Sequence, residues 1–475
     1  MKKTFENKRQ EVEYLLNKQK IRSVTDLDSY KLDICHPDSA GIDLGSKEIY
    51  VAIPPTRAAE LDVDIVHKFA THTQDLLACR DLFTYSGINT VSMESTSVYW
   101  VTLFDILTES GIEVCLVNPK KFRMVPGRKT DVLDCQWLQI LHTYGLLRGS
   151  FHPDNHIKQL RTYMRHRDKL ICEQGRFVQR MQKAMIQMNL LLHNVIDDIT
   201  GVSGIRIIES ILKGERDPEK LVKLCDWRIK ATDQQIIDSL QGYYKEDQLF
   251  LLQQNYDSYC FFSKQIEKTD KEIEALLKTF SLKRASKDKK PENHKPKNIR
   301  SKNSLKTKDN IEDMLFRILG TDLSSLPGFR GQAILQVISE VGYDMSKFPN
   351  ASHFASYLGF VPHNKITGGQ IINSKTDRIK SSAAQTFRKV IPAISRSNTA
   401  LGGFYRRLAP RIGKGQAIVA CCRKLSMMFY NALKFGIEYV EHGNEKYIEQ
   451  QKKYKAKALM KLAKELNMEI VEKLA

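Results

Sequence analysis

The chain has 475 residues, of which 42% are apolar, so it is long enough for two or three domains that each enclose a hydrophobic core. It carries 74 Lys and Arg against 55 Asp and Glu, and the resulting formal charge of +19 predicts a polyanionic partner, most naturally DNA or RNA. No apolar stretch approaches the length of a membrane span, and nine scattered cysteines without a CxxC pair argue against zinc, so we expect a reduced protein of the cytoplasm.

The first 150 residues predict an arm followed by an α/β domain. Residues 1–37 are rich in charge and predict a helical arm. Residues 38–150 alternate strand-like and helical stretches, an order that predicts a mixed sheet covered by helices. An RNase H-like (RuvC-like) domain has this layout, and it gathers acids from its first strand, its fourth strand and a late helix around one cleft.

Four carboxylates lie where such a cleft would need them. Asp43 belongs to the first strand, and Glu94 ends a β-branched run. Asp131 and Asp134 are three residues apart, so both project from one face of a helix. Each acid alone is more often a helix cap or a solvated charge. Together they supply the hard oxygen ligands that two Mg²⁺ ions need for phosphoryl displacement, so we predict that all four are catalytic metal ligands.

Residues 151–280 predict a helical region in which apolar residues recur every seven positions. This spacing indicates a long coiled-coil helix, and we expect a dimer contact along it. The alternative is a long helix that packs within its own domain, because a Met-rich seam specifies a partner poorly. The seam consists of Met164, Ile171, Val178, Met185, Leu192 and Ile199, joined in its second half by Met181, Met188 and Val195.

Residues 281–310 hold eleven Lys or Arg, three acids and almost no apolar side chains. Such a segment buries too little surface to offset the loss of chain entropy, so we predict a flexible basic linker. It could also contact phosphates, although a solvated linker is the more frequent case.

The predicted C-terminal domain, residues 311–442, is mainly helical and is followed by a charged helix at 443–475. Pro327, Gly328 and Gly331 form a turn between two apolar stretches. This pattern predicts a helix-hairpin-helix whose backbone N–H groups hold a phosphate. A simple helical hairpin with glycine in its turn would give a similar string.

A second turn, KITGGQ, places Thr367 before two glycines. Glycine removes side-chain bulk and permits φ > 0, so a hydroxyl at this turn can approach a phosphate closely. Thr367 is therefore a candidate nucleophile, although such a string is more often only a turn. The basic residues that we expect to bind nucleic acid are Arg128, Lys129, Arg330, Lys375, Arg378, Lys380 and Arg388.

Several strings together resemble a known family. They are AGIDLGSKEIYVAI, VSMESTSVYW, NPKKFRMVPGRKTDVLDCQWLQ and YGLLRGSF, followed far downstream by LPGF and YLGFVPHNKITGGQ. These strings are similar to the RuvC-like DEDD transposases of the IS110 insertion-sequence family, which are recombinases guided by a bridge RNA. The likeness runs from about residue 38 to about residue 445, with the motifs in the family's order.

The resemblance implies that Asp43, Glu94, Asp131 and Asp134 hold Mg²⁺, or Mn²⁺ in its place. A hydroxyl of the C-terminal domain would attack the DNA phosphate and become covalently linked to it. The DNA partners would be the element ends and the target, both chosen by pairing with a structured bridge RNA. Homodimers would assemble into a tetramer whose sites combine acids and hydroxyls from different protomers. No ATP would be needed, and no Walker A string occurs.

The sequence departs from the family at two positions. The attacking hydroxyl of the family belongs to a serine, whereas the matching residue here is Thr367, whose methyl stiffens χ1 but leaves attack possible. Either Thr367 is the nucleophile, or this copy is impaired, or a neighbouring hydroxyl such as Ser374 has taken over, and we favour them in that order. Ser97 stands where the family usually has glycine, which would crowd the turn near Glu94.

Three other functions fit the same residues. A RuvC-like structure-selective endonuclease would cut with metal-activated water and form no covalent adduct. An inactive, transposase-derived nucleic-acid-binding protein would need the four acids only for folding. A protein of RNA processing would act on RNA and leave DNA untouched.

Overall fold

The computed structural model describes residues 33–95, 97–118, 131–147, 149, 154–280, 303–362, 364–376, 381–466 and 468. The chain divides into two compact units, residues 1–152 and residues 153–475. Each unit is described by itself. Among the described helices, none is long and apolar enough to cross a membrane.

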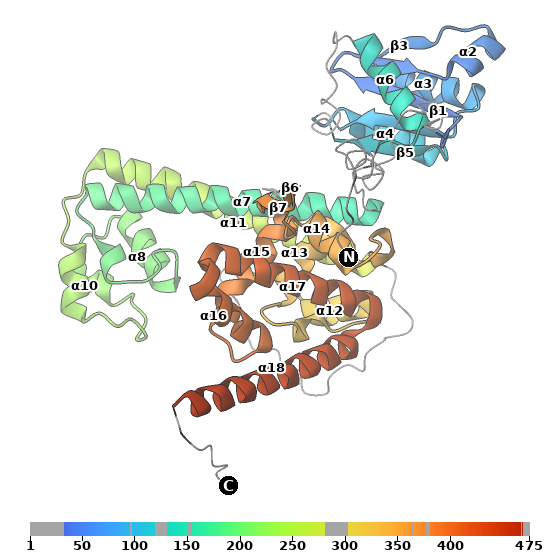
Figure 1. Cartoon of the computed structure of the whole chain (residues 1–475). Coiled ribbons are helices and arrows are strands. Elements are labelled where there is room, and N and C mark those ends of the chain that lie inside the picture. The colour runs from blue at the N-terminus through green and yellow to red at the C-terminus, as the bar shows by residue number, and fades with distance from the viewer. Residues whose placement is uncertain are drawn as a thin grey trace, which may run out of the picture. The chain divides into compact units, whose positions relative to one another are not determined.

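The first unit contains a five-stranded mixed sheet (Figure 1). Its spatial order is β3-β2-β1-β4-β5, in which β2 pairs antiparallel with β1 and β3, while β4 pairs parallel with β1 and β5. The predicted α/β domain is confirmed, and the topology is consistent with an RNase H-like fold. The strands are β1 (Ser39–Leu44), β2 (Glu48–Ala52), β3 (Val66–Ala70), β4 (Thr90–Glu94) and β5 (Glu113–Val117).

Helices cover both faces of this sheet. Strand side chains alternate between the faces, and Ala40 and Ile42 of β1 are buried in a core with side chains of α3 and α4. The opposite face of β1 packs against α6. The helices of this unit are α2 (Pro55–Leu61), α3 (Thr73–Tyr85), α4 (Trp100–Glu109) and α6 (Asp131–Thr143).

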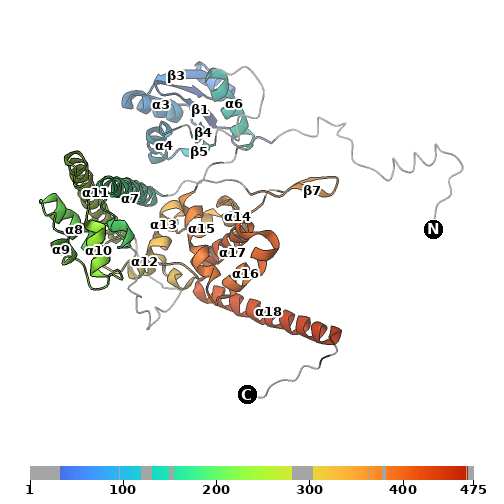
Figure 2. The ribbon, with the colours of Figure 1, turned by 90° about the vertical axis from the view of Figure 1, so that its left-hand side faces the viewer.

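A long pair of helices, α7 (Asn155–Gln187) and α11 (Glu246–Thr279), dominates the first half of the second unit (Figures 1 and 2). The two run in opposite directions, because Arg167 contacts Asp270 while Gln174, further along α7, contacts Ser263, which lies earlier on α11. A lobe at one end of the pair contains α8 (Val202–Leu212), α9 (Pro218–Val222) and α10 (Asp233–Leu240).

The helix predicted through residue 199 is shorter than expected. It ends at Gln187, just before Asn189, which adopts a φ of 56°. Asparagine tolerates this left-handed conformation and commonly ends helices in it. Met181 and Met185 of the expected seam pack into the core of the lobe, and α11 of the same chain is the partner of α7. Self-association through a coiled coil stays a prediction.

The chain returns to α11 directly after the basic segment. Arg167 and Asp270 form an ion pair that is 1% exposed on both sides, with 2.5 Å between Nε and Oδ1. Asp270 also accepts a hydrogen bond from the Lys306 N–H, and Glu274 accepts one from the Lys308 N–H. Residues 303–310, the end of the predicted linker, are therefore docked on α11.

The remainder of the second unit is a helical bundle around an aromatic core. Phe329, Phe354, Phe387 and Phe429 are buried in it, with Phe329 5.3 Å from the rings of both Phe387 and Phe429. The helices are α12 (Ile311–Leu319), α13 (Gly331–Val341), α14 (Ala351–Tyr357), α15 (Ser382–Ser395), α16 (Ala400–Ile412), α17 (Lys414–Phe435) and α18 (Ile437–Glu465), and a short hairpin joins β6 (Lys365–Thr367) to β7 (Gln370–Asn373).

The turn predicted to form a helix-hairpin-helix lies directly before α13. A β-carbon at Gly331 would come within 2.3 Å of Ile311 Cγ2, so close packing against α12 requires glycine there. The Gly331 N–H donates a hydrogen bond to the Glu312 carboxylate. This N–H, which could have bound a phosphate, is therefore already paired. A helix-hairpin-helix that binds phosphate stays a prediction.

Candidate functional site

One face of the sheet in the first unit is polar although it is covered by a helix. Ser39 on β1 and Thr90 and Ser92 on β4 all form hydrogen bonds to α6. Ser92 Oγ donates to the Leu138 carbonyl at 3.1 Å, and Thr90 Oγ1 lies 2.9 Å from His142 Nε2. Buried hydroxyls are costly unless they are paired, so these bonds fix the position of α6 across the two strands.

Close contact between backbones sets the distance between α6 and the sheet. A β-carbon at Gly41 would lie 2.2 Å from the Cys135 carbonyl oxygen and 2.4 Å from the Gln139 nitrogen. No side chain other than the hydrogen atom of glycine fits this gap. Helix α6 therefore rests on the backbone of β1.

The four predicted acids lie toward one end of this packed face. Asp43 follows Gly41 by two residues, so it points to the same side of β1, and Glu94 follows Ser92 in the same way on β4. The two strands are parallel neighbours, with Ile42 opposite Met93, so both acids lie at the carboxyl end of their strands. Asp131 and Asp134 occupy the first turn of α6, where the helix dipole favours negative charge.

The charges of the other three acids act on Asp43. The pKa of Asp43 is raised to about 6. Burial is the largest cause, and the charges of Asp131, Asp134 and Glu94 add to it. The Leu44 N–H opposes these effects by donating a hydrogen bond to the carboxylate. The charges of the other acids thus disfavour the ionised form of Asp43.

The donor set fits a hard divalent cation. Four carboxylates offer only oxygen, which Mg²⁺ and Mn²⁺ prefer over nitrogen or sulfur. The nearby thiol of Cys135 has a pKa raised by burial to about 12, so it stays protonated at neutral pH. As the described side chains stand, no three acids, histidines or cysteines are close enough together to enclose an ion. The repulsion at Asp43 is what an added cation would relieve.

The turn after Glu94 is strained at Ser97. This residue adopts a φ of 52°, a left-handed conformation that is rare for a side chain other than that of glycine or asparagine. The indole N–H of Trp100 donates to the Ser97 carbonyl at 3.2 Å, and Ser95 bonds to the Val117 carbonyl of the neighbouring strand. These contacts fix the conformation of the turn despite its strain.

Thr367 lies in the second unit, at the end of β6. It pairs with Gln370 across a two-residue loop in which Gly368 and Gly369 have φ of 58° and 78°. Two positive φ values in such a loop define the type I′ geometry that matches the twist of a hairpin. The Thr367 side chain is exposed, and a β-carbon at either glycine would meet no atom within 4 Å. The hairpin therefore presents a hydroxyl in an open position.

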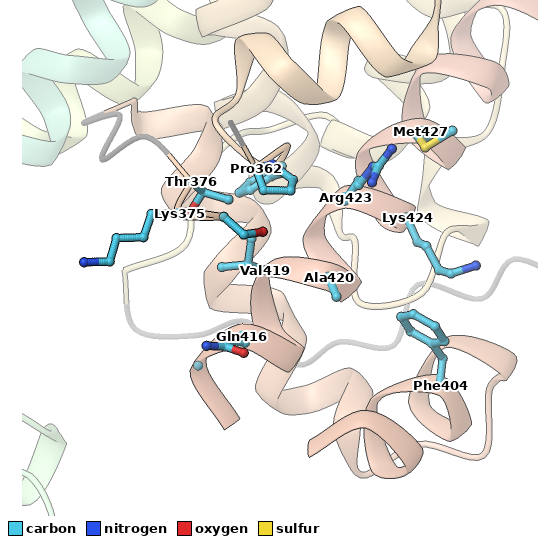
Figure 3. Close-up of a pocket in the computed structure, with 13 residues that line it drawn as sticks. Pro362, Lys375, Thr376, Phe404, Gln416, Val419, Ala420, Arg423, Lys424 and Met427 are labelled. Atoms are coloured by element: carbon cyan, nitrogen blue, oxygen red, sulfur yellow. The ribbon is translucent and has the colours of Figure 1, made fainter. Parts of the chain in front are cut away.

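A cavity of about 780 Å³ opens at the base of this hairpin (Figure 3). One wall comes from Phe360, Pro362 and residues 374–376, which directly follow β7, and the others come from α16 and α17. Figure 3 shows Arg423 and Lys424 on α17, with Phe404 of α16 below Lys424. The cavity with these walls is called the hairpin pocket below.

The predicted nucleic-acid contacts fall into two groups. Lys375 lines the hairpin pocket, the Arg388 guanidinium lies 5.3 Å from the centre of the Phe360 ring, and Arg330 precedes α13. Arg128, Lys129, Arg378 and Lys380 lie outside the described residues. No phosphate contact of any of these cations is shown, so their role stays a prediction.

Two features escaped the sequence analysis. The polar face of the sheet under α6 was missed, because serine and threonine at alternate positions of a strand usually indicate a side that faces solvent. The hairpin pocket was missed because its walls come from separate stretches around residues 360–376 and 404–427. The string GKGQ at the start of α17 was the one local signal, because glycines before a long helix are typical of anion sites.

Comparisons with known proteins connect both units to mobile elements. A family model for a DEDD-type transposase of IS110 matches residues 40–190, and a second model, described as the transposase IS116/IS110/IS902 family, matches residues 320–400. The first match includes all four acids and the second includes Thr367. A search of curated proteins finds no match.

Proposed function

The chain belongs to the IS110 family of DEDD transposases, and from this premise we propose that it cuts and rejoins DNA through a covalent bond to Thr367, aided by Mg²⁺ or Mn²⁺. The family establishes DNA transposition as the class of activity and DNA as a partner. The observation that supports the finer proposal is the placement of Asp43 and Glu94 at the carboxyl ends of neighbouring strands, with the charges of Asp131 and Asp134 acting on Asp43.

In this proposal the four acids hold the divalent cation. When bound, the cation neutralises charge on the scissile phosphate and lowers the pKa of the attacking alcohol. Burial, followed by the charges of the other three acids, raises the pKa of Asp43 to about 6. A bound cation would favour the ionised form of this carboxyl.

Thr367 supplies the nucleophile. Its hydroxyl loses a proton and forms a new bond from Oγ1 to phosphorus, while one bridging P–O bond of the DNA strand breaks and the released sugar oxygen takes up a proton. The reverse step, in which a sugar hydroxyl of another strand attacks the same phosphorus, rejoins DNA and frees Thr367. The number of phosphoester bonds is conserved, so no nucleotide triphosphate is consumed.

The open hairpin supports Thr367 over Ser374 as the attacking residue. Thr367 lies next to the glycine loop at the tip, where no neighbouring atom would obstruct a phosphate. Ser374 lies at the base of the hairpin and lines the pocket. The acids and Thr367 belong to different compact units, which is compatible with a composite site formed by two protomers.

An RNA guide and a tetramer are further parts of the proposal. The formal charge of +19 would suit a protein that holds the backbones of DNA and a structured RNA together, while base pairing selects the sequence. Purification of the full chain followed by sequencing of bound RNA tests this part. RNA encoded beside the protein's own gene is expected, whereas random cellular RNA would contradict the guide.

Trapping of a protein–DNA adduct tests the central step. The full chain is incubated with labelled DNA that spans the ends of its own element and with Mg²⁺, and adducts are detected on a denaturing gel. Thr367→Ala is expected to lower adduct formation on the order of 10³-fold or more, and Ser374→Ala is expected to leave it unchanged. Thr367→Ser restores the family's residue and is expected to form adduct at least as fast as the threonine protein.

The same experiment separates the alternative functions. Normal cutting by Thr367→Ala would support an endonuclease that uses water, an alternative favoured by threonine in place of the family's serine. Absence of cutting and of adducts in both the parent chain and Thr367→Ser would support an inactive DNA-binding descendant. Cutting of RNA but not of DNA would contradict both of these alternatives and would support a protein of RNA processing.

A further inference from the structure

We propose that the hairpin pocket holds one unpaired nucleotide of the DNA strand that Thr367 attacks. The proposal rests on the proposed function, because it assumes that the hairpin approaches DNA. It goes beyond that function in assigning a binding site, its ligand and the residues that recognise it. At about 780 Å³, the pocket falls within the range of roughly 300–1,000 Å³ that is usual for small-molecule sites.

The charge of the pocket suits a phosphate. Its lining includes Lys375, Arg423 and Lys424 but no Asp or Glu. Among the described residues, no carboxylate forms an ion pair with Arg423. Figure 3 shows the Lys375 ammonium directed away from Val419, whereas Arg423 and Lys424 extend from α17, which forms the opposite wall. The Arg423 charge is available to a phosphate.

The start of α17 adds uncommitted backbone donors to the same wall. Gly415 and Gln416 line the pocket, and no described side chain caps this helix. Gly413 adopts a φ of 86°, and a β-carbon at Gly415 would meet no atom within 4 Å. The first N–H groups of a helix lack partners within it, so those here are free to donate to phosphate oxygens.

The remaining walls suit a base. Phe404 lies beside the cavity with the Lys424 ammonium 4.6 Å from its ring centre, and Val419, Ala420 and Met427 give apolar surface. The Arg407 guanidinium also lies 5.7 Å from the centre of this ring, so a base that stacks on Phe404 would meet positive charge beside it. Stacking on an aromatic ring is available only to an unpaired base, because a paired base is already stacked in its duplex.

The location of the pocket connects the base to the attacking hydroxyl. Thr367 pairs with Gln370, and Ser374 follows Gln370 by four residues along β7. At the usual rise of a strand this places the pocket about 13 Å from the hairpin tip. One DNA strand could therefore reach both the pocket and Thr367 within a few nucleotides.

Fluorescence of 2-aminopurine tests the proposal in the full-length protein. Single-stranded DNA oligonucleotides carry the probe at successive positions near the cut site, and RNA of the same sequence is compared. Quenching is expected at one or two positions of the DNA. Phe404→Ala is expected to remove the quenching and weaken binding on the order of tenfold, while Phe404→Tyr retains both.

Matched variants separate the pocket from general charge. Arg423→Gln is expected to weaken DNA binding more than Arg317→Gln, which removes an equal charge from the exposed face of α12, and Phe250→Ala removes an exposed ring outside the pocket as a second control. Quenching that survives in Phe404→Ala, or that occurs with RNA but not with DNA, would overturn the proposal. Quenching by a Thr367→Ala protein that forms no adduct would support the pocket even if the covalent mechanism failed.

Discussion

Gly41 on β1 lies so close to Cys135 on α6 that an added β-carbon would approach the Cys135 carbonyl oxygen to 2.2 Å. The contact is between backbones, so neither side can yield by changing a rotamer. Because Asp43 lies two residues after Gly41 and Asp134 lies one residue before Cys135, this contact sets the separation of two predicted metal ligands.

Gly41→Ala is expected to displace α6 and to destabilise the first unit by about 2 kcal/mol, the usual size of an overpacking effect. Urea denaturation measures the loss, and Mg²⁺-dependent stabilisation is expected to weaken with it. Gly175→Ala is the matched control, because a β-carbon there meets no atom within 4 Å and alanine favours a helix interior by about 0.5–1 kcal/mol. Equal stability of the two variants would contradict the role of the contact.

Asp43→Asn is expected to raise the melting temperature at pH 7 when divalent cations are absent. The Asp43 pKa rises from 3.8 to about 6 in the folded protein, so the folded state binds more protons than the unfolded state between these values. Stability contributed by this carboxyl is therefore lost as the pH rises from about 4 to about 6, and the cost is complete at pH 7.

Metal is expected to stabilise the parent protein but not this variant. Mg²⁺ is expected to raise the melting temperature of the parent protein at pH 7 and to have little effect on Asp43→Asn, measured by calorimetry. Asp64→Asn, an exposed acid in the same unit, is the charge-matched control. A parent protein indifferent to Mg²⁺ and Mn²⁺ would contradict the metal site.

Ser97→Gly is expected to stabilise the first unit by about 1 kcal/mol, because glycine adopts a φ of 52° without steric cost. Ser97→Ala keeps the β-carbon and is expected to give no such gain. Thermal denaturation of the two variants measures the difference. Similar stability of both variants would show that the strain at this turn is small.

Asp270→Ala is expected to destabilise the second unit by about 3–5 kcal/mol, because it leaves the buried Arg167 charge without its carboxylate. The double variant Arg167→Met with Asp270→Leu removes both charges and is expected to recover most of the loss. Denaturation of the single and double variants measures the free energies of unfolding for a double-mutant cycle. A double variant as unstable as the single one would mean that packing, rather than the unpaired charge, causes the loss.

Local patterns predicted the α/β unit and the position of its acids, because alternation along β1 and the helical spacing of Asp131 and Asp134 are set by neighbouring residues. The strand β3 was missed because its sequence, VHKFA, has weak alternation and only half-buried apolar side chains. The end of α7 was missed because Asn189 interrupts a heptad pattern that continues past it. Tertiary contacts, such as those of α6 and the hairpin pocket, depend on residues far apart in sequence.

The basic segment leaves from the end of α11 at Phe280, and the chain after it is fastened to Asp270 and Glu274 of that same helix. At 1.5 Å per residue, the points of departure and return are separated by about 9–15 Å along the axis. The number of residues between Phe280 and residue 303 therefore does not decide where the chain rejoins α11. Doubling such a loop costs only about 0.6 kcal/mol, so natural relatives are free to lengthen, shorten or recharge it without rebuilding the fold.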